Sequence, residues 1–151
     1  MRDLKVTPIK NGTVIDHIPA GMALKVLKVL GISENVPSTV SVLLHVPSKM
    51  QGWKDIVKVE DRELNPRELS KIALIAPDAT INIIRNYNVA EKHTVALPER
   101  AVGILRCANP NCITNSREPV ESVFLVRSKD PLRLQCHYCD REIEDVPAHV
   151  L

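Results

Sequence analysis

Residues 107–112 read Cys-Ala-Asn-Pro-Asn-Cys, and residues 136–139 read Cys-His-Tyr-Cys. The chain has four cysteines, so each of them belongs to one of these two close pairs. Two pairs of thiolates on tight turns supply the tetrahedral set that binds Zn²⁺ at about 2.3 Å, and four protein ligands leave no position for a reactive water. The spacing therefore predicts one structural zinc ion, with a C-terminal fold organised around it. The predicted ligands are Cys107, Cys112, Cys136 and Cys139.

The segment that carries the cysteines is too short to bury a large core by itself. It contains β-like runs at residues 120–127 and 132–135 and no apolar helical stripe. Metal binding is therefore expected to supply much of its folding free energy, so chelation should unfold residues 101–151 selectively. His137 lies between two ligands, and we expect it to point away from the metal toward the surface.

Residues 1–98 alternate strand and helix signals. An apolar stripe between Pro19 and Gly31 predicts one helix, and Asn65-Pro66-Arg67-Glu68 has the pattern of a capping box that begins a second helix. In the predicted strand 39–46, Val40, Val42, Leu44 and Val46 are expected on one face. The other predicted strands are residues 6–9 and 13–18, joined by a turn at Asn11-Gly12, and residues 53–60, 79–85 and 88–97.

This order of elements predicts an α+β protein. Its N-terminal part is expected to be a ferredoxin-like α/β sandwich, in which two helices cover one face of a mostly antiparallel sheet. A small β-rich zinc domain with four cysteine ligands should follow it. Because Pro98-Glu99-Arg100 reads as a short polar joint, we expect one domain at residues 1–98 and the zinc domain at residues 99–151.

Charge and hydropathy limit the classes of partner. Residues 1–98 hold 13 basic and 10 acidic residues, a net charge of +3, whereas residues 99–151 hold 7 and 8, a net charge of −1. Binding to nucleic acid phosphates needs clustered basic residues, so a zinc-ribbon nucleic-acid-binding protein is disfavoured. The sequence has no run of about 18 apolar residues and no signal peptide, which predicts a cytoplasmic protein with no membrane partner. In that reducing compartment the cysteines should bind metal rather than form disulfides.

The first hundred residues contain no glycine-rich phosphate loop, so an anion would have to be bound by lysines. Lys54 and Lys58 lie on one face of the predicted strand 53–60 and are the best candidates for this, although their spacing alone is more typical of a solvated strand face than of an anion site. Asp16 and His17 are adjacent in a strand and should face opposite ways, which argues against a catalytic dyad. They could contact a ligand or form a structural hydrogen bond. A small enzyme is also disfavoured, because no nucleophile–base pair or open metal site is evident.

Several stretches resemble the regulatory chain of aspartate carbamoyltransferase. The resemblance extends in order along nearly the whole chain. It is carried by residues 13–20 (TVIDHIPA), 53–60 (WKDIVKVE), 76–82 (APDATIN), 86–87 (NY) and 97–100 (LPER), together with the cysteine spacing.

The resemblance implies a non-catalytic subunit that takes part in allosteric control of pyrimidine biosynthesis. It implies an N-terminal domain that binds ATP as activator and CTP, with UTP, as inhibitors. It further implies a zinc domain that docks onto the catalytic chain, and homodimers of the regulatory chain that bridge two catalytic trimers.

The resemblance also assigns residues to a nucleotide site. These are Val6, Ile9, Val14, Asp16, His17, Lys54, Lys58, Asn82, Ile84, Tyr87, Val89 and Lys92, with Lys5 near a second nucleotide or the triphosphate. Pro8 and Trp53 depart from the family pattern, which bears on nucleotide discrimination; proline removes a backbone donor. Polar residues around the zinc turns are expected to contact the catalytic chain, namely Asn109, Asn111, Glu118, Tyr138 and Asp140.

Overall fold

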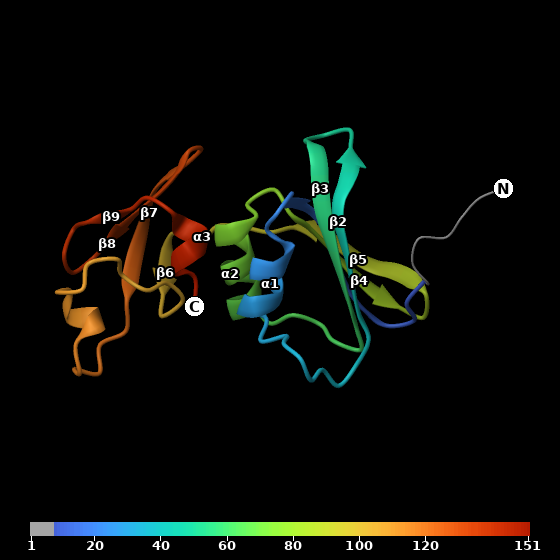
Figure 1. The fold of residues 1–151 in the computed structure, drawn as a ribbon, viewed down its shortest axis with the longest axis horizontal. Coiled ribbons are helices and arrows are strands. Elements are labelled where there is room, and N and C mark those ends of the chain that lie inside the picture. Colours follow the sequence, from blue (N-terminus) through green and yellow to red (C-terminus); the bar gives the residue numbers. More distant parts are fainter. Residues whose placement is uncertain (1–7) are drawn as a thin grey trace.

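The computed structural model describes residues 8–151 and contains two antiparallel sheets with three α-helices (Figure 1). The first part of the chain forms β1 (Gly12–Pro19), α1 (Ala23–Val29), β2 (Val40–Ser48), β3 (Gly52–Glu60), α2 (Pro66–Ile75), β4 (Thr80–Arg85) and β5 (Asn88–Thr94). The second part forms β6 (Arg100–Val102), a 3₁₀ turn (Ile113–Asn115), β7 (Val123–Lys129), β8 (Leu132–Cys136), β9 (Glu142–Ile143) and α3 (Val146–His149). The predicted α+β class is confirmed.

The first sheet has the strand order β2-β3-β1-β4-β5. Its first four strands, with α1 after β1 and α2 after β3, have the ferredoxin-like arrangement, and β5 adds a hairpin strand at one edge. Both helices lie against the same face of the sheet (Figure 1). That face contributes Ile15, Val57 and Ile81, all fully buried, to a core shared with Val26 of α1 and Ile72 of α2. Among residues 8–151 no helix covers the opposite face of this sheet (Figure 1).

The predicted hairpin around Asn11-Gly12 does not form in the described part of the chain. Thr13 of β1 pairs with Val59 of β3 on one side and with Ile83 of β4 on the other. Both edges of β1 are therefore occupied, and Pro8 and Ile9 lie outside any strand. Residues 6 and 7 of the predicted first strand lie outside the described residues.

Helix α1 is shorter than predicted, because Pro19 belongs to β1 and the helix begins at Ala23. The carboxylate of Asp55, fully buried on β3, accepts hydrogen bonds from the backbone N–H groups of Gly21 (2.9 Å) and Ala23 (3.1 Å). It thus satisfies donors at the helix start from another strand. At the other end Gly31 has φ +73°, and Ile32 N–H donates to the Leu27 carbonyl, as in a Schellman motif.

The start of α2 matches the sequence prediction in detail. The Asn65 side chain accepts from Glu68 N–H at 2.8 Å, and the Glu68 carboxylate accepts from Asn65 N–H at 3.0 Å. Pro66 occupies the first helical position, and the helix ends before Pro77. This capping box fixes where α2 begins.

The prediction that Val40, Val42, Leu44 and Val46 share one face is wrong for Val46. Val40 and Val42 pair with Val59 and Val57, whereas Val46 pairs with Lys54, which lies on the opposite face of β3. Leu44 and His45 together oppose one residue of β3, Asp55, in a β-bulge, and His45 has φ +57°. The extra residue shifts the alternation of side chains beyond the bulge and turns Val46 to the face of Lys54, while Leu44, in the bulge, is 55% exposed. The bulge is held by a hydrogen bond from His45 N–H to the Asp55 carboxylate at 2.9 Å.

The second sheet, in the order β6-β7-β8-β9, lies beside the helices of the first part (Figure 1). Helix α3, which the sequence did not predict because four residues show no stripe, packs against α2. Arg67 of α2 donates to the Gly103 carbonyl at 2.6 Å, and Lys25 of α1 donates to the Val150 carbonyl at 3.2 Å. Within residues 8–151 no helix has the length and apolar character needed to cross a bilayer.

Candidate functional site

The four cysteines converge in the second part of the chain. Their Sγ atoms all lie within 4.8 Å of one another. Cys107 Sγ is 3.6 Å from Cys139 Sγ, and Cys112 Sγ is 3.7 Å from Cys136 Sγ. Each of these distances joins one cysteine of the first pair to one cysteine of the second pair. A tetrahedral ion with sulfur ligands at 2.3 Å places those sulfurs roughly 3.8 Å apart. The donor set and its spacing therefore fit one structural zinc ion, as the cysteine pattern predicted.

Hydrogen bonds within the loop hold the first cysteine pair in place. Cys112 N–H donates to the Asn109 carbonyl at 3.0 Å, which closes the turn between the two cysteines. The Asn115 side-chain amide donates to the carbonyls of Cys107 (2.9 Å) and Asn109 (2.7 Å). The second pair begins where β8 ends at Cys136, and Asp140 N–H donates back to the Cys136 carbonyl at 3.0 Å. Hydrogen bonds within the protein therefore define both turns without a contribution from the metal.

Burial raises the pKa of the Cys107 thiol to about 12 and also raises the pKa of Cys136. For Cys139 desolvation by burial again acts to raise the pKa, but hydrogen bonds from Arg141 N–H and from other donors lower it to about 7. Because zinc binds thiolates, it must displace the protons that burial keeps on Cys107 and Cys136. The metal is therefore expected to bind more tightly as the pH rises.

His137 is exposed and makes an edge contact with the Tyr138 ring, at 5.1 Å between ring centroids. It is not one of the residues of the cysteine cluster, in agreement with its prediction as a surface residue. The expected partner contacts differ in exposure. Asn109 is buried with its side chain engaged inside the loop, whereas Asn111, Glu118, Tyr138 and Asp140 are exposed.

A second group of predicted residues meets on the open face of the first sheet. Val14 of β1 pairs with Lys58 of β3 and with Asn82 of β4, and Asn82 pairs with Lys92 of β5. Directly paired residues of antiparallel strands point to the same face. These four side chains therefore form a row across four strands, on the face opposite the helices. We call them the Lys58–Lys92 row.

Further predicted residues lie around this row. Ile84 of β4 is paired with Val89 of β5 across a bulge and is two positions from Asn82. Asp16 and Lys54 lie at the other end of the face, where Lys54 Nζ is 2.9 Å from an Asp16 carboxylate oxygen. Within residues 8–151 no acidic residue forms an ion pair with Lys58 or Lys92.

Asp16 and His17 form a bulge in β1, where they together oppose Ile56 of β3. His17 has φ +59°, its N–H donates to the Asp16 carboxylate at 2.6 Å, and its ring nitrogen Nδ1 is 2.9 Å from Thr80 Oγ1. The two side chains do not contact each other as a catalytic dyad would. Thr80 is a polar neighbour of His17 that local sequence patterns could not predict, because the contact depends on the pairing of β1 with β4.

Tyr87 lies at the tip of the β4–β5 hairpin and is 66% exposed. It forms a two-residue turn with Asn86, and both have φ values above +50°, as a type I′ turn requires. Ile9, predicted in the same site, is 8% exposed, and Val6 and Lys5 lie outside the described residues. Trp53 lies on the same face of β3 as Asp55, opposite to Lys54 and Lys58, and its ring stacks on the His45 ring with 3.9 Å between the ring centroids.

The arrangement provides two separate chemical capacities. The Lys58–Lys92 row offers two cationic groups on either side of an amide and an apolar side chain, which suits a ligand that carries both an anion and a flat polar ring. The cysteine cluster offers a closed metal site with no vacant ligand position, which suits a structural ion rather than a catalytic one.

Comparison with known proteins identifies both parts. Residues 4–96 match the family model of the allosteric domain of the aspartate carbamoyltransferase regulatory chain. Residues 99–147 match the model of the metal-binding domain of the same chain.

Whole-chain relatives agree with the domain matches. The chain is 57% identical to the aspartate carbamoyltransferase regulatory chain of Methanothrix thermoacetophila, over 99% of this chain and 97% of that one. The identity is 57% with the regulatory chain of Korarchaeum cryptofilum (95% of this chain, 92% of that one) and 56% with that of Pyrococcus horikoshii (96% and 95%). These relatives are named as regulatory chains, consistent with a non-catalytic subunit. The chain therefore belongs to the family of aspartate carbamoyltransferase regulatory chains.

Proposed function

We propose that this regulatory chain binds nucleoside triphosphates on the open face of its first sheet. It controls a catalytic chain that docks on residues 99–151, which we call the zinc half. The effectors that the family resemblance implies are ATP, CTP and UTP. We propose residues 1–98 as the nucleotide-binding domain and residues 99–151 as the docking domain. The Lys58–Lys92 row is the observation that carries the proposal, since it gathers lysines from β3 and β5 on one exposed face.

The charges on this face support triphosphate binding. Lys54 already neutralises Asp16, whereas Lys58 and Lys92 have no acidic partner among residues 8–151. A phosphate chain could therefore pair with both of these ammonium groups without displacing a carboxylate. Asn82 lies between them in the row, and its amide can donate and accept hydrogen bonds with a base or ribose.

The zinc ion has a structural role in the proposal. With the metal bound, the two cysteine turns become a rigid support, and exposed residues beside them, Asn111, Tyr138 and Asp140, can meet a partner without much loss of side-chain freedom. Ile113, 46% exposed in the adjoining 3₁₀ turn, adds an apolar contact. We therefore propose that the catalytic chain docks against these turns.

Co-purification with the catalytic chain tests the proposal. The zinc-loaded chain should co-elute with the catalytic chain, and ATP and CTP should change the substrate saturation curve of the complex but not that of the catalytic chain alone. Equilibrium binding of each nucleotide to the isolated regulatory chain provides the second measurement. Co-elution without any nucleotide response would exclude the effector role, and failure of the zinc-loaded chain to co-elute would exclude the docking role.

We further propose that the chain forms a homodimer through β2. This edge strand has no charged residue, whereas the opposite edge strand β5 carries Glu91 and Lys92. An uncharged edge strand readily pairs with another chain, and proteins usually cover or charge such an edge. At the same edge Leu44 is 55% exposed, and Met50 in the adjoining turn is 73% exposed. A second copy of β2 would cover both the edge and the apolar side chains.

Sedimentation equilibrium of the isolated zinc-loaded chain should give twice the 16.8 kDa mass of one chain. Leu44→Asp introduces a charge at the proposed interface and is expected to give monomers. Ala90→Asp places the same charge on the β5 edge and should leave the dimer intact. A dimer that tolerates Leu44→Asp but dissociates with Ala90→Asp would place the interface at β5 and contradict the proposal.

A further inference from the structure

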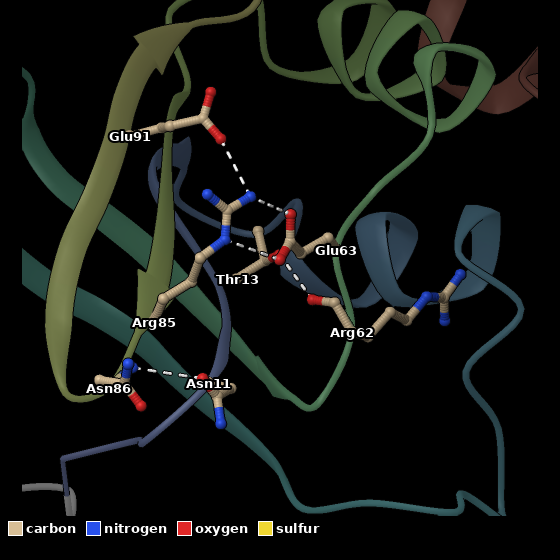
Figure 2. A network of polar contacts seen from close by, with 7 residues as sticks. All are labelled: Asn11, Thr13, Arg62, Glu63, Arg85, Asn86 and Glu91. Carbon is tan, nitrogen blue, oxygen red and sulfur yellow. Dashed lines mark hydrogen bonds and ion pairs between the residues drawn. The ribbon is translucent and has the colours of Figure 1, made fainter.

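The β4–β5 hairpin has charged residues on the side opposite the proposed nucleotide site. Arg85 and Glu91 lie on the face that also carries Ile83, whereas Asn82 and Lys92 lie on the open face. Arg85 donates to both carboxylate oxygens of Glu63, from Nε at 3.1 Å and from Nη2 at 2.7 Å. The same Nη2 donates to Glu91 at 3.1 Å (Figure 2). We call these three residues the Arg85 network.

The Arg85 network joins two parts of the fold that are separate in the sequence. Glu91 lies on β5 next to Lys92, whereas Glu63 lies between β3 and α2. Residues 8–151 contain five ion pairs, and the Arg85–Glu63 pair alone links the β4–β5 hairpin to the segment that leads into α2. The hydrogen bond from Arg85 lowers the pKa of Glu63, and the hydrogen bond to Glu63 raises the pKa of Arg85, so both groups carry their charges at neutral pH.

Hydrogen bonds and an ion pair join the segment around Glu63 to β1, to the end of α1 and to α2. The buried Thr13 hydroxyl on β1 donates to the Arg62 carbonyl at 2.7 Å. The Arg62 side chain points away from Glu63 (Figure 2), where it donates to the Leu30 carbonyl at the end of α1 (2.9 Å) and to Glu68 of the α2 capping box. A displacement of this segment would therefore shift the start of α2.

Helix α2 continues the connection to the zinc half. Arg67, one residue before Glu68, donates to the Gly103 carbonyl at 2.6 Å. An added Cβ at Gly103 would lie 2.5 Å from the end of the flexible Glu121 side chain and 3.6 Å from Arg67 Nη1, so the Arg67 side chain is in van der Waals range of Gly103. Through the hydrogen bond, a shift of the start of α2 would pull on the backbone at Gly103.

The hairpin turn is fixed on its other side by backbone contacts. Asn86 N–H donates to the Asn11 side chain at 3.2 Å (Figure 2), and Tyr87 N–H donates to the Lys10 carbonyl at 2.9 Å. Since these contacts hold the tip, a ligand that pulls Lys92 is expected to move β5 rather than the turn. Glu91, the neighbour of Lys92, would move with it and change how Arg85 is shared between Glu91 and Glu63.

We propose that Arg85 and Glu63 are positioning residues that couple nucleotide binding on the open face to α2 and, through Arg67 and Gly103, to the zinc half. The inference rests on the proposed nucleotide site. Arg85 acts as the switching element because its Nη2 donates both to Glu91 on the β4–β5 hairpin and to Glu63 on the segment before α2. Coupling between distant sites needs such an element whose arrangement both sites can bias.

The test uses the complex assembled with the catalytic chain. Glu63→Gln removes the charge with little change of shape, and Arg85→Glu with Glu63→Arg exchanges the two charges. Glu142→Gln is the matched control, because it removes a carboxylate from the Arg133–Glu142 pair, which is exposed to a similar degree and joins neighbouring strands of the zinc half. For each variant we would measure nucleotide affinity directly and, separately, the change in substrate half-saturation that saturating ATP or CTP produces.

We expect Glu63→Gln to leave nucleotide affinity within about threefold and to reduce the nucleotide-induced shift by about threefold to tenfold, as mutations along a coupling route do. The charge exchange should restore at least part of the shift, and Glu142→Gln should change neither quantity. A full shift in Glu63→Gln would overturn the inference, as would a loss of affinity equal to the loss of response. An unsubstituted complex that binds neither nucleotide would overturn the proposed function as well, so the two failures are distinguishable.

Discussion

Replacing Cys136 by serine is expected to abolish zinc binding and to unfold residues 99–151 while the first sheet stays folded. Cys136 Sγ is fully buried, 3.7 Å from Cys112 Sγ, and the residue ends the strand β8 at the centre of the small sheet. Zinc binding to small structural sites is worth about 10–16 kcal/mol at neutral pH. That exceeds what a segment of this size retains without the metal, since whole domains are stable by only about 5–15 kcal/mol.

Hydrogen exchange resolved by peptide, together with zinc content, measures this effect. In Cys136→Ser, amides of β7 and β8 should exchange as in an unfolded chain, whereas amides of β1 and β3 should remain protected. Co-elution with the catalytic chain should be lost. His137→Ala is the matched control, because His137 is exposed beside the same ligand and should be dispensable for the metal. Native protection of β7 and β8 in the serine variant would show that the fold does not depend on zinc.

Replacing Lys58 by alanine is expected to weaken ATP and CTP binding by about tenfold or more, because a charge-assisted hydrogen bond contributes about 1.5–3 kcal/mol. Lys58 lies on β3 in the row with Val14, Asn82 and Lys92, and within residues 8–151 it has no acidic partner to lose. Truncation should therefore remove a ligand contact without breaking an internal ion pair. Assembly with the catalytic chain should be unchanged.

Calorimetric titration of the isolated chain measures the affinity, and the activity of the complex measures the response. Lys28→Ala is the control, since Lys28 lies on α1 on the other side of the sheet and is exposed. It should bind nucleotide like the unsubstituted chain. A Lys58→Ala chain with normal nucleotide affinity would place the site elsewhere, whereas one that fails to assemble would indicate a structural role for this lysine.

Local sequence patterns predicted several elements well, because their causes are local. The capping box at Asn65 and Glu68 involves atoms three residues apart, so its pattern of residue types is sufficient to place the start of α2. The Schellman motif at Gly31 is local in the same sense. The four cysteines were assigned correctly as one cluster because each pair already forms a turn, and thiolate chemistry leaves few other uses for two such pairs.

The patterns failed where a distant residue decides the outcome. The bulge that turns Val46 to the other face of the sheet is held by the Asp55 carboxylate, and nothing in residues 40–46 indicates that hydrogen bond. The hairpin expected at Asn11-Gly12 was wrong because β3 and β4 occupy both edges of β1. The contact of His17 with Thr80 likewise depends on strand pairing across 63 residues.

By itself the sequence determined the metal chemistry, the class of fold, the ends of the second helix and, through its resemblance to a family, the candidate residues of the nucleotide site. The tertiary structure alone decided that Lys58, Val14, Asn82 and Lys92 form one row and that Arg85 meets Glu63. The reason is physical. Cysteine ligation and helix capping act between near neighbours in the chain, whereas strand register and ion pairs between loops depend on which segments the buried core brings together.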